Sequence, residues 1–170
     1  DGYGALNAFS LDDITLDIDI ESLGSDPIVI DEIRIIAPEI YVRSTRDGST
    51  NITDLRKNIQ ESLGEGSEGG SGGSEGNEKK ILIKKFVFDG GKIELDATAL
   101  GQEKRTLQLP GITMNDIGGP GGFYPDQITA VILDRVTERV ASEVARAGVR
   151  EAAEKKLESE AKKLLDRGKD

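Results

Sequence analysis

The chain contains no histidine, no cysteine and no tryptophan among its 170 residues. Without histidine it lacks the commonest general base and metal ligand near neutral pH. Without cysteine it has no thiolate nucleophile, no disulfide and no thiolate zinc site. We therefore expect no catalytic residues, no cofactor and no metal site, and predict that the protein is not an enzyme. A hydrolase that uses two carboxylates is the remaining enzymatic alternative.

Positive charge is also scarce, since 22 Lys and Arg residues stand against 32 Asp and Glu residues, a net charge of −10. Phosphate backbones bind to clusters of Lys and Arg, so the balance argues against a nucleic-acid partner and against docking on anionic lipid. No run of residues approaches the roughly 20 apolar residues of a membrane span. The chain opens at DGYGALNAFS without Met, so we expect membrane association only through an anchor upstream, absent from this sequence.

What the sequence does contain is a degenerate internal repeat with an offset of 53 residues. Residues 28–42, IVIDEIRIIAPEIYV, align without a gap on residues 81–95, ILIKKFVFDGGKIEL. The apolar positions coincide, and a turn-forming residue falls at the same place, Pro38 against Gly91. The pattern predicts that one β supersecondary element, strand–corner–strand–turn–strand, occurs twice and that both copies share one sheet.

Each copy shows a break in its alternation, at Asp31–Glu32 in the first and at Lys84–Lys85 in the second. Side chains of a strand alternate between its two faces, so a one-residue break moves the following apolar residues to the other face. They stay on one face only if the strand takes up an extra residue. We therefore expect a β-bulge or a corner at each break. The two breaks carry opposite charges, so these pairs should face each other if the copies lie side by side.

Further strands and two helices follow from local patterns. Residues 14–20 alternate strictly and predict a half-buried strand with an acidic outer face, whose carboxylates offer a weak calcium alternative. Residues 106–109 and 112–117 predict two short strands. A short amphipathic helix is expected over 51–63, begun by an Asn51 or Thr53 cap rather than marking Asn51 as a glycosylation site. A long amphipathic helix is expected over 126–147, after a Gly-rich turn.

The predicted fold class is α+β. We expect a curved, mostly antiparallel β-sheet built from the duplicated strand–turn–strand unit, with a short helix and a long C-terminal amphipathic helix. Residues 1–147 form a single β-rich domain that includes a flexible acidic Gly/Ser linker at 64–78, and residues 148–170 form a charged helical tail. The apolar faces of the two copies either line an open groove or form a core under the long helix, and we favour the covered core. These residues are Ile28, Ile30, Ile33, Ile35, Ile81, Ile83, Phe86 and Phe88.

The run SLDDITLDIDIESLGSDPIVIDEIRIIAPEIYV, followed by a short Asn-Ile-Thr-Asp-Leu helix, resembles the N-terminal region of AsmA-like bacterial envelope proteins. The later run KILIKKFVFDGGKIELDATALG and a final amphipathic helix fit small members of that family, and the likeness covers residues 5–147. The acidic Gly/Ser insertion and the charged tail depart from it. The resemblance implies an extracytoplasmic protein of a diderm bacterium, in the periplasm or at the cell surface. It also implies that β-sheet grooves of such proteins take part in lipid movement and outer-membrane assembly.

Two functional hypotheses follow. The first is a non-enzymatic envelope protein whose curved sheet binds lipid or scaffolds an envelope protein. The second is an extracellular filament subunit that polymerises with other copies of itself by β-strand addition. In the second, the N-terminal segment with Tyr3, Leu6 and Phe9 is the candidate donor strand.

Overall fold

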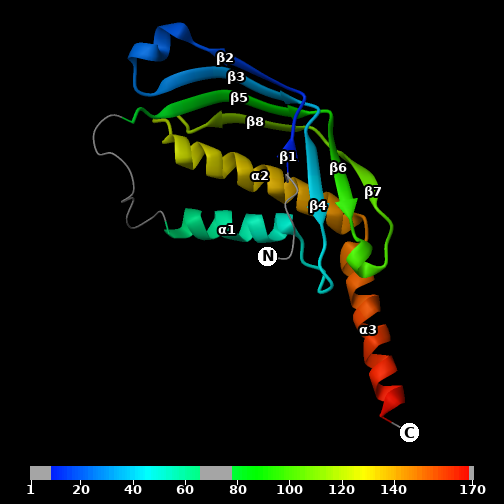
Figure 1. Cartoon of the computed structure of the whole chain (residues 1–170). Coiled ribbons are helices and arrows are strands. Elements are labelled where there is room, and N and C mark those ends of the chain that lie inside the picture. Colours follow the sequence, from blue (N-terminus) through cyan, green and yellow to red (C-terminus); the bar gives the residue numbers. More distant parts are fainter. Residues whose placement is uncertain (1–8, 66–77, 169–170) are drawn as a thin grey trace.

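The computed structural model describes residues 9–65 and 78–168 as an α+β fold (Figure 1). The three helices among these residues are α1 (Asn51–Glu65), α2 (Pro125–Arg146) and α3 (Val149–Arg167). The strands in chain order are β1 (Phe9–Ser10), β2 (Asp13–Ile18), β3 (Ile28–Ile36), β4 (Glu39–Arg43), β5 (Ile81–Asp89), β6 (Gly91–Asp96), β7 (Arg105–Leu109) and β8 (Ile112–Ile117).

The strands form two mixed sheets in place of the single sheet that the sequence predicts. One has the order β2-β3-β5-β8 and the other the order β1-β4-β6-β7. Each has a parallel pair at its centre, β3 with β5 or β4 with β6, and antiparallel pairs at its edges. Neither sheet is curled, so the prediction of a curved sheet is wrong.

The two sheets are the two halves of one bent layer. Each strand of the first sheet is joined by a short turn to the strand at the same position in the second, so both sheets keep the same order. The layer bends where β3 passes into β4 and where β5 passes into β6 (Figure 1). The backbone turns there through a left-handed residue at equivalent positions, Ala37 with φ 49° and Gly90 with φ 66°.

The two copies of the repeat lie side by side in the register that the alignment predicts. In the first sheet Ile28 is opposite Ile81 and Ile36 is opposite Asp89, and in the second Ile40 is opposite Ile93. The offset of 53 residues therefore holds along both parallel pairs. The duplication and its apolar pattern are confirmed.

The break in alternation of the first copy is a bulge and not a corner, whereas at the break of the second copy β5 keeps its register with β8. Asp17 of β2 is opposite Glu32 while Ile18 is opposite Ile30, so Asp31 is the extra residue. This bulge keeps the apolar residues before and after it on the same face of β3. The corner lies further along the chain, at Ala37.

Charges at equivalent positions of the two copies are complementary. Lys84 Nζ lies 2.6 Å from Asp31 Oδ1, and Lys85 Nζ lies 3.5 Å from Glu32 Oε2, as the sequence predicts. Two further ion pairs have the same offset, Lys92 with Glu39 at 2.5 Å and Arg43 with Asp96 at 3.5 Å. Like charges at these positions would repel, so the charge pattern favours the pairing of copy one with copy two.

The long helix α2 covers one face of the bent layer. Its apolar stripe recurs at every fourth residue, and Val136, Val140 and Val144 are buried against the core strands. Figure 1 shows α2 running beneath β5 and β8, with α1 packed on its other side. The expected helix and the expected helix-covered core are thus both present. Beyond Gly148, α3 projects from the body, and only its first turns are buried.

Asn51 has a different role from the predicted cap. The hydroxyl of Thr50 accepts a hydrogen bond from Thr53 N at 3.1 Å, so Thr50 begins α1. The amide of Asn51 instead accepts from Arg43 N at 3.0 Å and donates to Tyr41 O at 2.9 Å. Asn51 therefore ties the helix to β4. Most of the predicted linker, and Tyr3 and Leu6, lie outside the described residues.

Candidate binding surface

The apolar residues of the first sheet form three rows across its four strands. Since directly paired residues share a face, each row runs from β2 through β3 and β5 to β8. The rows are Ile14–Ile35–Phe88–Ile112, Leu16–Ile33–Phe86–Met114 and Ile18–Ile30–Ile83–Ile117.

Burial falls steadily along these rows toward β2. Ile83 and Phe86 on β5 are only 1% and 2% exposed, whereas Ile33 on β3 is partly exposed. On β2, Ile14 is 55% exposed and Leu16 is 53% exposed. The helix α2 thus covers the β5–β8 side of the face and leaves the β2 side open. The strand expected over residues 14–20 is present as β2 but ends at Ile18, before a 3-10 helix over Ile20–Gly24. Its predicted half-burial is wrong, because alternation shows which residues share a face but not whether a helix covers that face.

We call Ile14, Leu16, Ile33 and Ile35 the β2 apolar patch. Apolar residues that flank β2 along the chain are exposed as well, namely Leu11, Ile20 and Leu23. Contiguous exposed apolar surface of this kind is unusual on a soluble protein and is typical of a binding surface.

The opposite face of β2 is acidic. Asp13 and Asp17 alternate with the apolar residues of this strand and are exposed. On β3, the carboxylate of Glu32 has a lowered pKa because it accepts a hydrogen bond from Arg34 at 2.9 Å, with a smaller effect from Lys85. The pKa of Lys84 is raised by its hydrogen bond to Asp31. The patch is therefore an apolar strip backed by a charged surface.

The structure divides the eight predicted face residues into three groups. Ile83, Phe86 and Phe88 are fully buried in the core. Ile30, Ile33, Ile35 and Ile81 are partly buried and pack against it. Ile28 is opposite Ile81 but lies outside the core cluster. Ile14 and Leu16 were not among the predicted site residues, although their alternation in sequence was the available signal.

The candidate donor segment is described only at its end. Phe9 is opposite Ile40 and Ser10 is opposite Glu39, so the backbone of β1 pairs with β4 of its own chain.

Within residues 9–65 and 78–168, no group of three or more Asp or Glu side chains is arranged to hold a metal ion. No described helix is long and apolar enough to cross a membrane.

Comparisons with models of protein families, with curated proteins and with solved structures find no match to this chain. The resemblance to AsmA-like proteins therefore rests on the sequence pattern alone and stays a prediction.

Proposed function

We propose that this protein is a non-enzymatic binding protein of the bacterial envelope, outside the cytoplasm, that holds the hydrocarbon chain of a lipid on the β2 apolar patch. The observation that carries the proposal is the gradient of burial along two of the three rows, which end in exposed Ile14 and Leu16, while the third ends in partly buried Ile18. The location in the envelope and the choice of a lipid as ligand come from the resemblance to AsmA-like proteins.

The size of the patch sets the expected affinity. Fully burying an Ile or Leu side chain is worth about 1.5–3 kcal/mol. Because Ile14 and Leu16 are 55% and 53% exposed, covering both contributes about 1.5–3 kcal/mol in total before the costs of association. This predicts weak and reversible binding of a single chain. Because the opposite face of β2 is acidic, a lipid with a zwitterionic head group suits the surface better than an anionic lipid.

The experiment is a titration with lysophosphatidylcholine below its critical micelle concentration, followed by native mass spectrometry and by calorimetry. The intact protein should bind, and the variant Ile14→Ser/Leu16→Ser should lose binding. A control is Leu164→Ser/Leu165→Ser, which removes two apolar residues of α3 that are even more exposed. Equal binding by both variants would refute the proposal, whereas circular dichroism should show both folded, because none of these side chains is buried.

A second candidate is self-assembly by strand addition, and one observation favours it. Within the described residues β2 pairs only with β3, so its outer backbone edge has no strand partner. Such an edge with exposed apolar side chains is a template for another strand. Sedimentation velocity at increasing protein concentration should then show growing species whose size depends on Ile14 and Leu16. A constant monomer mass would exclude this candidate and leave the lipid proposal intact.

A further inference from the structure

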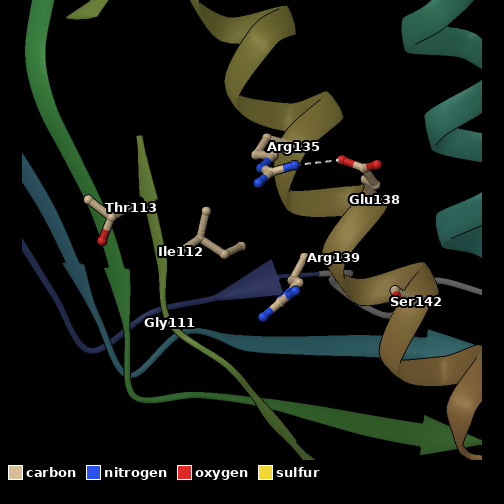
Figure 2. A pocket seen from close by; sticks show the side chains of 7 residues that line it. All are labelled: Gly111, Ile112, Thr113, Arg135, Glu138, Arg139 and Ser142. Carbon is tan, nitrogen blue, oxygen red and sulfur yellow. Dashed lines mark hydrogen bonds and ion pairs between the residues drawn. The ribbon is translucent and has the colours of Figure 1, made fainter. Parts of the chain in front are cut away.

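A cavity of about 280 Å³ lies between α2 and the beginning of β8, on the side of the sheet away from β2 (Figure 2). It is lined by Gly111, Ile112, Thr113, Arg135, Glu138, Arg139 and Ser142. Figure 2 shows Arg139 extending from α2 into the space between helix and strand, whereas the guanidinium of Arg135 is turned to Glu138 on the same helix. The cavity therefore has a basic wall in a protein with a net charge of −10.

Arg139 is a partly exposed cation in this wall. Its Nε is buried and has no hydrogen-bond partner among the described residues. Within the same part of the chain, no carboxylate lies within ion-pair distance of its guanidinium. Buried polar groups are usually hydrogen-bonded, so an unpaired guanidinium nitrogen in a cavity indicates a missing acceptor.

The neighbouring charges do not supply that acceptor. Glu138 is occupied by Arg135, at 3.1 Å, and lies 3.9 Å from Arg56. Arg56 also lies 3.6 Å from Asp134. Arg56 of α1 and Arg135 of α2 thus share Asp134 and Glu138, and among the described residues Arg139 has no ion pair. Arg135 and Arg139 stand four residues apart on the helix, a spacing at which like charges repel unless an anion lies between them.

We propose that this cavity binds a small organic molecule through a carboxylate or phosphate group held by Arg139. The guanidinium has a planar fork of N–H donors that matches two oxygens of such a group. Arg135 adds positive charge, and the hydroxyl of Ser142 adds a further donor at the cavity wall. The volume is at the lower limit of ligand pockets, which favours a small metabolite over a nucleotide or a lipid. The site is separate from the β2 apolar patch.

The test follows the arginine Nε–H signals by nuclear magnetic resonance during titration with inorganic phosphate and, separately, with acetate, at constant ionic strength. The Arg139 signal should shift and saturate. Saturation with one probe only would identify the anionic group, and saturation with both would show that either group is accepted. If neither probe gives a saturable shift, the proposal is wrong.

Three variants separate a built site from general electrostatic attraction. Arg139→Lys keeps the charge but loses the fork, so affinity should fall about tenfold or more. Glu138→Gln removes the competing carboxylate and should tighten binding. Arg150→Gln, on exposed α3 where Arg150 pairs with Glu154 at 3.3 Å, should leave binding unchanged. An equal affinity in the Arg139→Lys variant would overturn the proposal, and an unchanged backbone spectrum verifies that each variant is folded.

Discussion

The first copy of the repeat, β3–β4, and the second, β5–β6, carry apolar residues at the same positions but are buried to different extents. In the second sheet the two copies are equivalent, since Ile40 and Ile93 are 3% and 0% exposed. In the first sheet they are not, since Ile83 is 1% exposed and its partner Ile30 is partly exposed. The same apolar pattern thus forms a core where α2 covers it and an open surface beyond the helix.

The comparison predicts which substitutions destabilise the fold most. Ile83→Ala should lower the free energy of unfolding by about 2–5 kcal/mol, because it leaves a cavity in a packed core. Ile30→Ala, in the equivalent position, should cost roughly half as much, because its surroundings are already open to water. Urea denaturation followed by circular dichroism measures both values.

The second sheet provides the matched control for this pair. Ile40→Ala and Ile93→Ala should each cost about 2–5 kcal/mol and should agree closely, because both side chains are fully buried. Equal costs for Ile30→Ala and Ile83→Ala would show that the asymmetry of the first sheet is wrong.

Substitutions at the bend should change the free energy of unfolding by a smaller amount, and in opposite directions in the two copies. Ala37 has φ 49° and should be strained, whereas Gly90 has φ 66° at no steric cost. Ala37→Gly should therefore stabilise the protein by up to about 1 kcal/mol, and Gly90→Ala should destabilise it by about 1–2 kcal/mol. Space is no obstacle at Gly90, because a Cβ there would lie 3.8 Å from the nearest atom, Ala37 N. Thermal unfolding that moves in the same direction for both variants would contradict the shared turn geometry.

The ion pairs between the two copies can be removed and then restored by substitution. Lys84→Asp/Lys85→Glu places acidic residues opposite Asp31 and Glu32, so the urea midpoint should fall. Adding Asp31→Lys/Glu32→Lys exchanges the charges of the two copies and should recover most of the loss.

The control for this exchange is Lys162→Glu/Lys163→Glu, which makes the same change in net charge on exposed α3. Its midpoint should change little. If the control falls as far as the reversal on β5, net charge rather than pairing between the copies is responsible.

The smallest effect is on the pH dependence of stability. The pKa of Glu39 is lowered by its hydrogen bond to Lys92 and then by that from Tyr41. A lowered folded pKa gives stability that is present above the ordinary value of 4.5 and lost as the pH falls below it. The pKa of Lys92 is raised by Glu39, so its contribution is lost as the pH rises above 10.5.

The free energy of unfolding should therefore show a plateau between these two limits. Glu39→Gln removes both the carboxylate and the partner of Lys92. The free energy of unfolding of this variant should therefore change less with pH at both the acid and the alkaline end. Unfolding curves collected across this range measure the effect. An unchanged acid edge in the variant would show that the pair between β4 and β6 contributes nothing.

The sequence was sufficient to predict the register of the two copies, because the alignment of residues 28–42 on 81–95 has no gap. It also predicted the ion pairs of Asp31 and Glu32 and the helix that covers the core. It placed a turn at Pro38 and Gly91, next to the left-handed residues Ala37 and Gly90. It did not show that the layer bends there, because Ala37 itself gives no sign of a left-handed backbone.

The candidate surfaces were harder to predict for physical reasons. Ile14 is exposed because α2 covers only part of the sheet. The alternation of β2 gives no information about which part the helix covers. The basic cavity depends on Arg139 Nε having no partner in the described part of the chain, while Glu138 is shared between Arg135 and Arg56. Such competition is a property of the packed structure and leaves no local pattern in sequence.

Whether the uncovered end of the first sheet binds lipid can be tested with the isoleucines of the repeat as probes. Protein labelled at isoleucine methyl groups is titrated with lysophosphatidylcholine below its critical micelle concentration and observed by nuclear magnetic resonance. We expect the methyl signals of Ile14, Ile33 and Ile35 to shift and those of Ile83 and Ile93 to stay unchanged. Equal shifts in both copies, or no shift at Ile14, would contradict the claim that the uncovered end of the first sheet is the binding surface.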